Sequence, residues 1–265
     1  MSSSLETIIN YNKKNKIIIK RKDCIDLLKE IDNNSINLIV TDPAYSGMNN
    51  KLKLGKGRIV GVYKERNSEN GKWFKEFEDT TENYNIFLSE CKRVLNKENG
   101  HIYLMFDSYS LLSLGHLVRN YFNVKNIITW DKVNLGMGHY FRRRHELIIF
   151  ATNNNNRKIR NKSIPDVWRF KRIINKEYPT QKPVELFQAM IYASAKEGFN
   201  VCDPFVGSGS SAIAAIKNNC NFIGCDISEK AVEICIKRIN YFINEKKDLY
   251  QNYEAHLTDE KKFWE

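Results

Sequence analysis

One segment is more informative about the fold of this chain than any other: Asn200-Val-Cys-Asp-Pro-Phe-Val-Gly-Ser-Gly-Ser-Ser-Ala212. A short apolar run ends at Asp203, two glycines follow at Gly207 and Gly209, and an apolar helical pattern continues to Ile216. Glycine lets the backbone turn tightly and approach a ligand closely where a helix begins. The segment therefore predicts a strand, a glycine turn and a helix.

A second strand follows this helix and ends in a carboxylate, Asp226, which is the placement of an acid that accepts hydrogen bonds from ribose hydroxyls. Three interpretations are open: a plain left-handed turn with a buried aspartate, a dinucleotide site, or a site for an adenosine cofactor without phosphate. A dinucleotide site needs a second mononucleotide-binding half, and only one helix-length segment and a charged tail follow Asp226. Asp203 would also repel a pyrophosphate, so the third interpretation is favoured.

Working outward, short apolar runs alternate with helical periodicity along the chain. The runs predict strands at residues 17–19, 36–41, 101–106, 126–130, 145–150, 201–202 and 221–225, and the periodicity predicts helices at 84–95, 111–122, 183–196 and from 228 onward. This alternation predicts an α/β fold with a mostly parallel sheet and helices on both faces. Residues 46–80 and 151–180 fit the alternation poorly. We interpret them as loops inserted into a single domain that spans residues 1–265.

The positive charge of the chain is concentrated in two windows. The net charge is +11, from 42 basic and 31 acidic residues. Residues 142–182 hold twelve Lys and Arg against three acidic residues, and residues 46–66 hold six against one, so the rest of the chain is slightly acidic. Basic charge confined in this way is typical of a face that binds a polyanion, and nucleic acid is the expected partner.

Composition excludes several other classes of protein. The six cysteines have no C-x-x-C spacing, so we expect reduced thiols and no metal site. No apolar run approaches the roughly 18–20 residues that cross a bilayer, and the N-terminus lacks the layout of a signal peptide. The expectation is a cytoplasmic protein.

A second motif carries chemistry: the buried strand at residues 36–41 leads into Asp42-Pro43-Ala44-Tyr45. The exocyclic nitrogen of adenine or cytosine is a poor nucleophile, because its lone pair is conjugated into the ring. Two acceptors aimed at its hydrogens would localise that pair, and the Asp42 carboxylate and the Pro43 carbonyl supply both. Tyr45 offers an aromatic face on which a flipped base can stack. The plain alternative is a strand that ends in a capped turn.

At this point the sequence resembles the amino-methylating DNA methyltransferases, in the permuted group whose catalytic motif precedes the cofactor motif. The resemblance covers roughly residues 15–245. It rests on Asp23-Cys24, Thr41–Tyr45, Arg93-Val-Leu, residues 141–150, Asp166-Val-Trp168, residues 179–183, residues 203–209 and Asp226. It implies a Rossmann-like methyltransferase fold with circularly permuted motif order and S-adenosylmethionine as the cofactor.

The resemblance also assigns roles to residues. It implies that Asp226 holds the ribose, that Asp23 contacts the cofactor adenine, and that residues 181–183 close over the methionine end. The implied cofactor-binding set is Asp23, Cys24, Lys182, Asp203, Phe205, Gly207, Gly209 and Asp226. The implied catalytic set is Asp42, Pro43 and Tyr45.

The tetrapeptide departs from the family pattern because Ala44 stands where a second proline is usual, which makes the loop less rigid. An aspartate in first place is usual among enzymes that act on adenine N6, whereas serine is common among those that act on cytosine N4. We therefore expect an adenine-specific enzyme. Cytosine N4 methylation, RNA methylation, a nicotinamide-dependent oxidoreductase and a catalytically inactive DNA-binding module remain open alternatives.

Two clusters are candidates for DNA contact. Arg142, Arg143 and Arg144 follow a flexible aromatic stretch and could meet phosphates or form a solvated charge run. A second cluster interleaves aromatic and basic character, which suits target contact: Trp168, Arg169, Lys171 and Arg172. DNA is the expected partner, and a homodimer and a cognate restriction endonuclease are left open as further partners.

Overall fold

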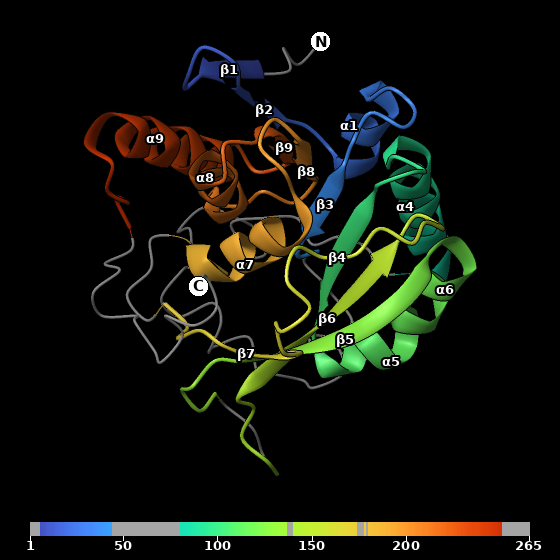
Figure 1. Ribbon diagram of the computed structural model, residues 1–265. Helices are drawn as coiled ribbons and strands as arrows, with labels where there is room; N and C mark the ends of the chain where they lie inside the picture. Colours follow the sequence, from blue (N-terminus) through green and yellow to red (C-terminus); the bar gives the residue numbers. More distant parts are fainter. Residues whose placement is uncertain (1–5, 44–79, 137–139, 174–177, 179, 251–265) are drawn as a thin grey trace.

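The computed structural model describes residues 6–43, 80–136, 140–173, 178 and 180–250. In these residues nine strands form one sheet in the order β1-β2-β9-β8-β3-β4-β6-β5-β7 (Figure 1). Their bounds are β1 Glu6–Asn10, β2 Lys16–Arg21, β3 Leu38–Thr41, β4 His101–Phe106, β5 Asn123–Asp131, β6 His145–Thr152, β7 Val167–Arg169, β8 Asn200–Asp203 and β9 Asn221–Asp226.

The sheet is mostly parallel, which confirms the predicted fold class. Strands β2, β9, β8, β3 and β4 run parallel to one another, and β5 runs parallel to β7. Antiparallel pairs join β1 to β2 and link β4, β6 and β5. The first and the seventh strands, β1 and β7, were not predicted. Both are short or largely exposed edge strands whose residues give little apolar signal.

Helices cover both faces of the sheet (Figure 1). Their bounds are α1 Cys24–Glu30, α4 Thr81–Val94, α5 Ser108–Leu114, α6 Val118–Tyr121, α7 Val184–Ser194, α8 Ser210–Lys217 and α9 Glu229–Glu245. In β3, Leu38 and Val40 pack with α7 and α8, whereas Ile39 points to the other face and packs with α1 and α4. This alternation buries every residue of the strand, as expected for a central parallel strand.

Local sequence explains where several helices begin and where one is interrupted. Asp23, Asp107 and Ser228 cap α1, α5 and α9 by accepting hydrogen bonds from backbone N–H groups of the first turn. The single helix predicted at 111–122 is instead broken into α5, a 3₁₀ turn at Gly115–Leu117 and α6. Glycine is a weak helix former, and the break falls on it.

The predicted inserted loops have different outcomes. Residues 46–79 lie outside the described residues. The described part of the other segment, 151–180, is mostly without helix or strand, but β6 extends to Thr152, β7 lies within it, and Trp168, Phe170 and Ile173 are buried. The sequence analysis missed β7 because it is only three residues long, too short to give a periodic signal.

In the part of the chain that the structure describes, no helix combines the length and the apolar character needed to cross a membrane. Within the same residues, no group of three or more His, Cys, Asp or Glu side chains could hold a metal ion.

Candidate active site

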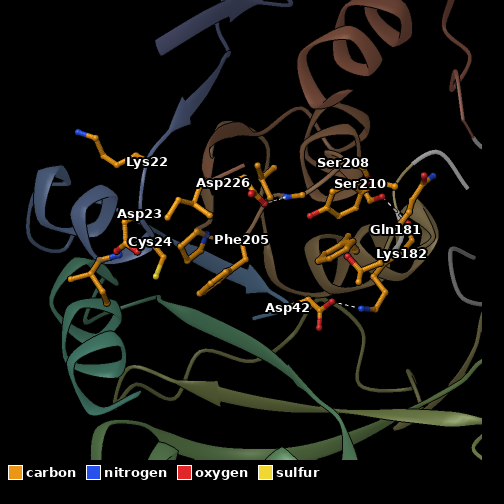
Figure 2. A pocket seen from close by; sticks show the side chains of 18 of the residues that line it. Lys22, Asp23, Cys24, Asp42, Gln181, Lys182, Phe205, Ser208, Ser210 and Asp226 are labelled. Atoms are coloured by element: carbon orange, nitrogen blue, oxygen red, sulfur yellow. Dashed lines mark hydrogen bonds and ion pairs between the residues drawn. The ribbon is translucent and has the colours of Figure 1, made fainter. Parts of the chain in front are cut away.

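The carboxyl ends of β3, β8 and β9 lie at one edge of the sheet, because these parallel strands run in the same direction. A cavity of about 400 Å³ opens there, within the size range of small-molecule sites. Its lining comes from segments that are far apart in the sequence (Figure 2), and it includes Asp23 and Cys24, Asp42, Asn83 and Ile86 of α4, Lys182, Phe205 and Gly207, and Asp226. An open α/β sheet places its ligand at such an edge, where the strand order changes direction.

Asp226, at the end of β9, is held by backbone N–H groups. Its carboxylate accepts hydrogen bonds from Gly207 N at 3.1 Å and from Ser228 N at 2.9 Å. Burial raises the pKa of Asp226 to about 6, although these N–H groups lower it. Gly207 has a φ of +49°, and a Cβ there would lie 3.2 Å from the Tyr178 ring. Glycine at this position therefore suits both the backbone angle and the close approach.

Cys24 and Phe205 belong to the apolar part of the lining. Cys24 is buried at the start of α1, behind the exposed cap residue Asp23, whose side chain accepts from Ile25 N at 2.8 Å. Phe205 is half-buried, and its ring packs edge-on against Phe87 of α4 with centroids 5.7 Å apart. The cavity thus has an apolar wall between two carboxylates, Asp23 and Asp226.

Two residues of the predicted cofactor-binding set do not line the cavity. Asp203 is buried beneath it and accepts hydrogen bonds from Thr41 Oγ1, Ser211 Oγ and Phe205 N at 2.8, 2.6 and 3.0 Å. Burial raises the pKa of Asp203 to about 7. Gly209 precedes α8 with a φ of +84°, and a Cβ there would lie 2.7 Å from Cys235 Sγ. Both residues shape the turn from behind and do not face the cavity.

Arg238 of α9 supports the same turn and was missed by the sequence analysis. Its side chain is fully buried, and Nη1 donates to Ser208 O at 3.1 Å and to Ser210 Oγ at 2.9 Å. Nε and Nη2 donate to the Asp248 carboxylate at 2.8 and 2.7 Å. The available signal was its spacing: Arg238 follows Ile234 and precedes Phe242 by four residues, which places it on the buried face of the helix.

A series of charged side chains of alternating sign begins at the other end of the cavity, with Asp42 and Lys182. Lys182 Nζ donates to Asp42 Oδ2 (Figure 2) and lies 3.7 Å from Glu146 Oε2. Glu146 Oε1 in turn lies 3.1 Å from Lys132 Nζ. Lys182, which the family resemblance assigns to cofactor binding, lines the cavity, and its ammonium group donates a hydrogen bond to Asp42. Pro43 is buried beside Asp42, and Ala44 and Tyr45 lie outside the described residues.

The pKa values at this end reflect burial and ion pairing together. Burial raises the pKa of Asp42, and the nearby Lys182 ammonium opposes that rise. Burial works against the charge of Lys182 as well, but the Asp42 and Glu146 carboxylates raise its pKa above the ordinary value. Lys182 is consequently a cation at neutral pH.

The predicted DNA-contact residues divide into exposed and buried ones. Arg142 and Arg172 are exposed, and Arg143 and Lys171 are half-buried. Arg144 is exposed and forms two hydrogen bonds of 2.7 Å with Asp131, the carboxylate that also lies 3.5 Å from Arg169.

Trp168 corrects the prediction of an aromatic residue in contact with the target. It is 2% exposed, and its Nε1 donates to Pro165 O at 2.7 Å. The reason is the alternation of a strand: in β7, Val167 and Arg169 point outward, so Trp168 points into the core beside Tyr103. Basic neighbours made this tryptophan resemble a stacking platform.

The sequence was then compared with known proteins. A family model described as DNA methylase matches residues 36–237, a span that includes Asp42, Lys182 and Asp226. The chain belongs to the DNA methylase family. This confirms the family resemblance and the predicted DNA methyltransferase activity, and it leaves the oxidoreductase alternative without support.

Individual relatives of this DNA methylase agree with the family. The Type II methyltransferase M2.DpnII of Streptococcus pneumoniae is 31% identical over 253 residues, which are 86% of this chain and 91% of the relative. The Type II methyltransferase M.HhaII of Haemophilus parahaemolyticus is 33% identical over 234 residues, 86% of this chain and 96% of the relative.

Solved structures resemble this DNA methylase in fold. The complex of M1.HpyAVI with SAM has a TM-score of 0.59 at 19% identity, covering 84% of this chain and 99% of that one. The cytosine-N4-specific PvuII DNA methyltransferase has a TM-score of 0.61 at 11% identity, covering 86% and 92%. The methyltransferase fold predicted from the sequence is confirmed.

Proposed function

We propose that this DNA methyltransferase transfers a methyl group from S-adenosylmethionine to N6 of adenine. One observation carries the proposal: Asp42 lines the same cavity as Phe205, Gly207 and Asp226. The acceptor motif and the glycine turn could have faced opposite sides of the sheet, and the assignment would then have no geometric basis. Their convergence supports a site in which a cofactor and a target base meet.

The residues of the cavity fit the cofactor. The Asp226 carboxylate accepts two backbone hydrogen bonds and has further lone pairs for the ribose hydroxyls. Phe205 and Asp23 both line the cavity, where Phe205 would offer an apolar face to the adenine and Asp23 would accept a hydrogen bond from it. The buried carboxylates around the turn, Asp203 and Asp226, disfavour a phosphorylated ligand. When bound, S-adenosylmethionine would supply a methyl group attached to a positively charged sulfur. A nucleophile can attack that methyl carbon directly, and the sulfur then leaves as a neutral thioether.

The Asp42 corner, Asp42 and Pro43, activates the amino group in this proposal. The Asp42 carboxylate and the Pro43 carbonyl would accept hydrogen bonds from its two N–H groups and so localise the nitrogen lone pair. The bond from nitrogen to the methyl carbon would form as the carbon–sulfur bond breaks, a neutral thioether would leave, and one amino proton would pass to Asp42 or to solvent. Positioning and electrostatics then account for the rate without a covalent enzyme intermediate. Tyr45 would stack on the flipped base.

Base and partner assignments rest on analogy with the family. The tetrapeptide begins with aspartate, which is usual among adenine-specific enzymes, and this favours adenine N6 over cytosine N4. The relatives are Type II methyltransferases, which favours a cognate restriction endonuclease as a functional partner. Arg142, Arg143, Lys171 and Arg172 would bind DNA phosphates beside the site.

The test is to incubate the purified protein with unmethylated plasmid and S-adenosylmethionine and to map modified bases by single-molecule sequencing. We expect N6-methyladenine at one short sequence, and none when the cofactor is omitted. N4-methylcytosine at that sequence would contradict the adenine assignment, and the absence of modification on plasmids of several compositions would contradict the enzyme assignment.

A further inference from the structure

Among the described residues, a single side chain holds the Asp42 carboxylate. Within the part of the chain that the structure describes, its one hydrogen bond comes from Lys182 and involves Oδ2. The Asp42 side chain is 23% exposed and lines the cavity. Oδ1 is therefore the oxygen left to accept a hydrogen from the target amino group.

Lys182 is itself held at both ends. Its carbonyl accepts a hydrogen bond from Ser210 Oγ at 2.7 Å, and the buried Pro183 follows it directly before α7. Its ammonium lies between Asp42 and Glu146, and its side chain is only 15% exposed. A lysine with a fixed backbone and two carboxylate partners has little freedom to leave this place.

The charge of Lys182 matters because an acceptor must be ionised. A protonated carboxyl group has lost one acceptor site and would donate a hydrogen where the reaction needs an acceptor. Burial favours that neutral form of Asp42 and raises its pKa, and the Lys182 ammonium counteracts this. The other ionisable groups around Asp42 are Glu146, Asp107, Asp203 and Tyr178, so Lys182 is the one cation among the described groups that act on it.

We propose that Lys182 is a positioning residue for Asp42: its ammonium holds Oδ2 and keeps the carboxylate ionised, so that Oδ1 accepts from the entering amino group. Glu146 holds the ammonium from the opposite side, and Lys132 neutralises Glu146 in turn. This inference rests on the proposed role of Asp42 as the acceptor.

The first experiment measures the ionisation of Asp42 in the free protein. Aspartate carboxyl carbons are labelled with ¹³C and titrated by NMR, and the Asp42→Asn variant identifies the Asp42 signal. We expect Lys182→Met to raise the pKa of Asp42 by about one to three units. Glu146→Gln should shift it in the opposite direction, because a neighbouring negative charge is removed. Lys237→Met, which removes an exposed lysine of α9, is the matched control and should change nothing.

The second experiment measures kcat and KM against pH. Lys182→Met should lower kcat at neutral pH about tenfold to hundredfold, with recovery as the pH rises and Asp42 ionises. The KM values for DNA and cofactor should change less than about threefold, and Lys182→Arg should restore most of the rate. A merely structural role predicts an equal loss at every pH and no rescue by arginine.

The outcomes separate this inference from the function on which it rests. An unchanged Asp42 titration in Lys182→Met, or a pH-independent loss of activity, would overturn the role of Lys182 even in an active enzyme. A wild-type protein that methylates no DNA would overturn the proposed function, and the NMR titration would still report whether Lys182 controls Asp42.

Discussion

The glycine turn, residues 203–209, and the Asp42 corner line the same cavity but are held in different ways. Behind the turn, Asp203 accepts three hydrogen bonds, and Arg238 donates to Ser208, Ser210 and Asp248. Asp42 has a single described hydrogen bond, from Lys182. The glycine turn is therefore a rigid wall of the cavity, and the Asp42 corner is a second wall held by one charged contact. The rigid wall suits the binding of a cofactor, whereas the Asp42 corner suits a base that must enter and leave. The difference predicts that substitutions in the two regions fail differently.

The largest expected effect is on methyl transfer, and it comes from a substitution at the Asp42 corner. Asp42→Ala should reduce methyl transfer on the order of 10³-fold, because it removes one of the two acceptors of the amino group. Affinity for S-adenosylmethionine should stay within about twofold, since the rigid wall is unaltered. Transfer of labelled methyl and calorimetric titration measure these quantities.

The control for that variant is Asp32→Ala, which removes an exposed aspartate after α1 and should leave the transfer rate unchanged. A large loss of cofactor affinity in Asp42→Ala would show that the two walls do not act independently.

The next effect is a loss of stability caused by overpacking behind the glycine turn. Gly209→Ala would place a Cβ 2.7 Å from Cys235 Sγ at a φ of +84°, whereas Gly198 has a φ of +79° with no atom within 4 Å. Gly198→Ala therefore measures backbone strain alone, about 1 kcal/mol. Gly209→Ala should cause overpacking in addition to this strain. It should lower the free energy of unfolding, measured by urea denaturation, by about 3 kcal/mol. Equal losses in the two variants would mean that the contact with α9 contributes nothing.

The smallest effect tests the cofactor side of the cavity without disturbing its packing. Asp226→Asn should weaken S-adenosylmethionine binding about tenfold, because a charged acceptor becomes a neutral one. The pKa of Asp226 in the free protein is about 6, and bound hydroxyl groups favour the carboxylate. Wild-type affinity should therefore rise from pH 5 to pH 7 and then level off.

The Asp226→Asn variant should lose that rise, because the group that titrates near pH 6 has been removed. An affinity that is independent of pH in the wild type would argue against hydrogen bonding by an ionised Asp226.

Much of the fold could be predicted because apolar runs mark buried strands directly. Seven of the nine strands in the described residues were found in this way, and the glycine turn identified the start of α8. The polar interactions behind the site were harder to predict. Arg238 and Lys182 are ordinary cations in the sequence, and their partners Asp248 and Asp42 are brought to them only by the tertiary fold. Trp168 shows the opposite error, since its basic neighbours concealed its place in the core.

The order of the strands has a consequence for how the protein is made. Strand β2 pairs with β9, and β3 pairs with β8, so strands from the N-terminal part of the sequence pair with strands near its C-terminal end. During synthesis the edges of β2 and β3 therefore remain without their partners until almost all of the described chain has left the ribosome. A polypeptide that stops before Asn200 contains Asp42 but lacks both strands and Asp226. Chains that end before Asn200 should therefore be inactive, because the cofactor side of the cavity is missing from them.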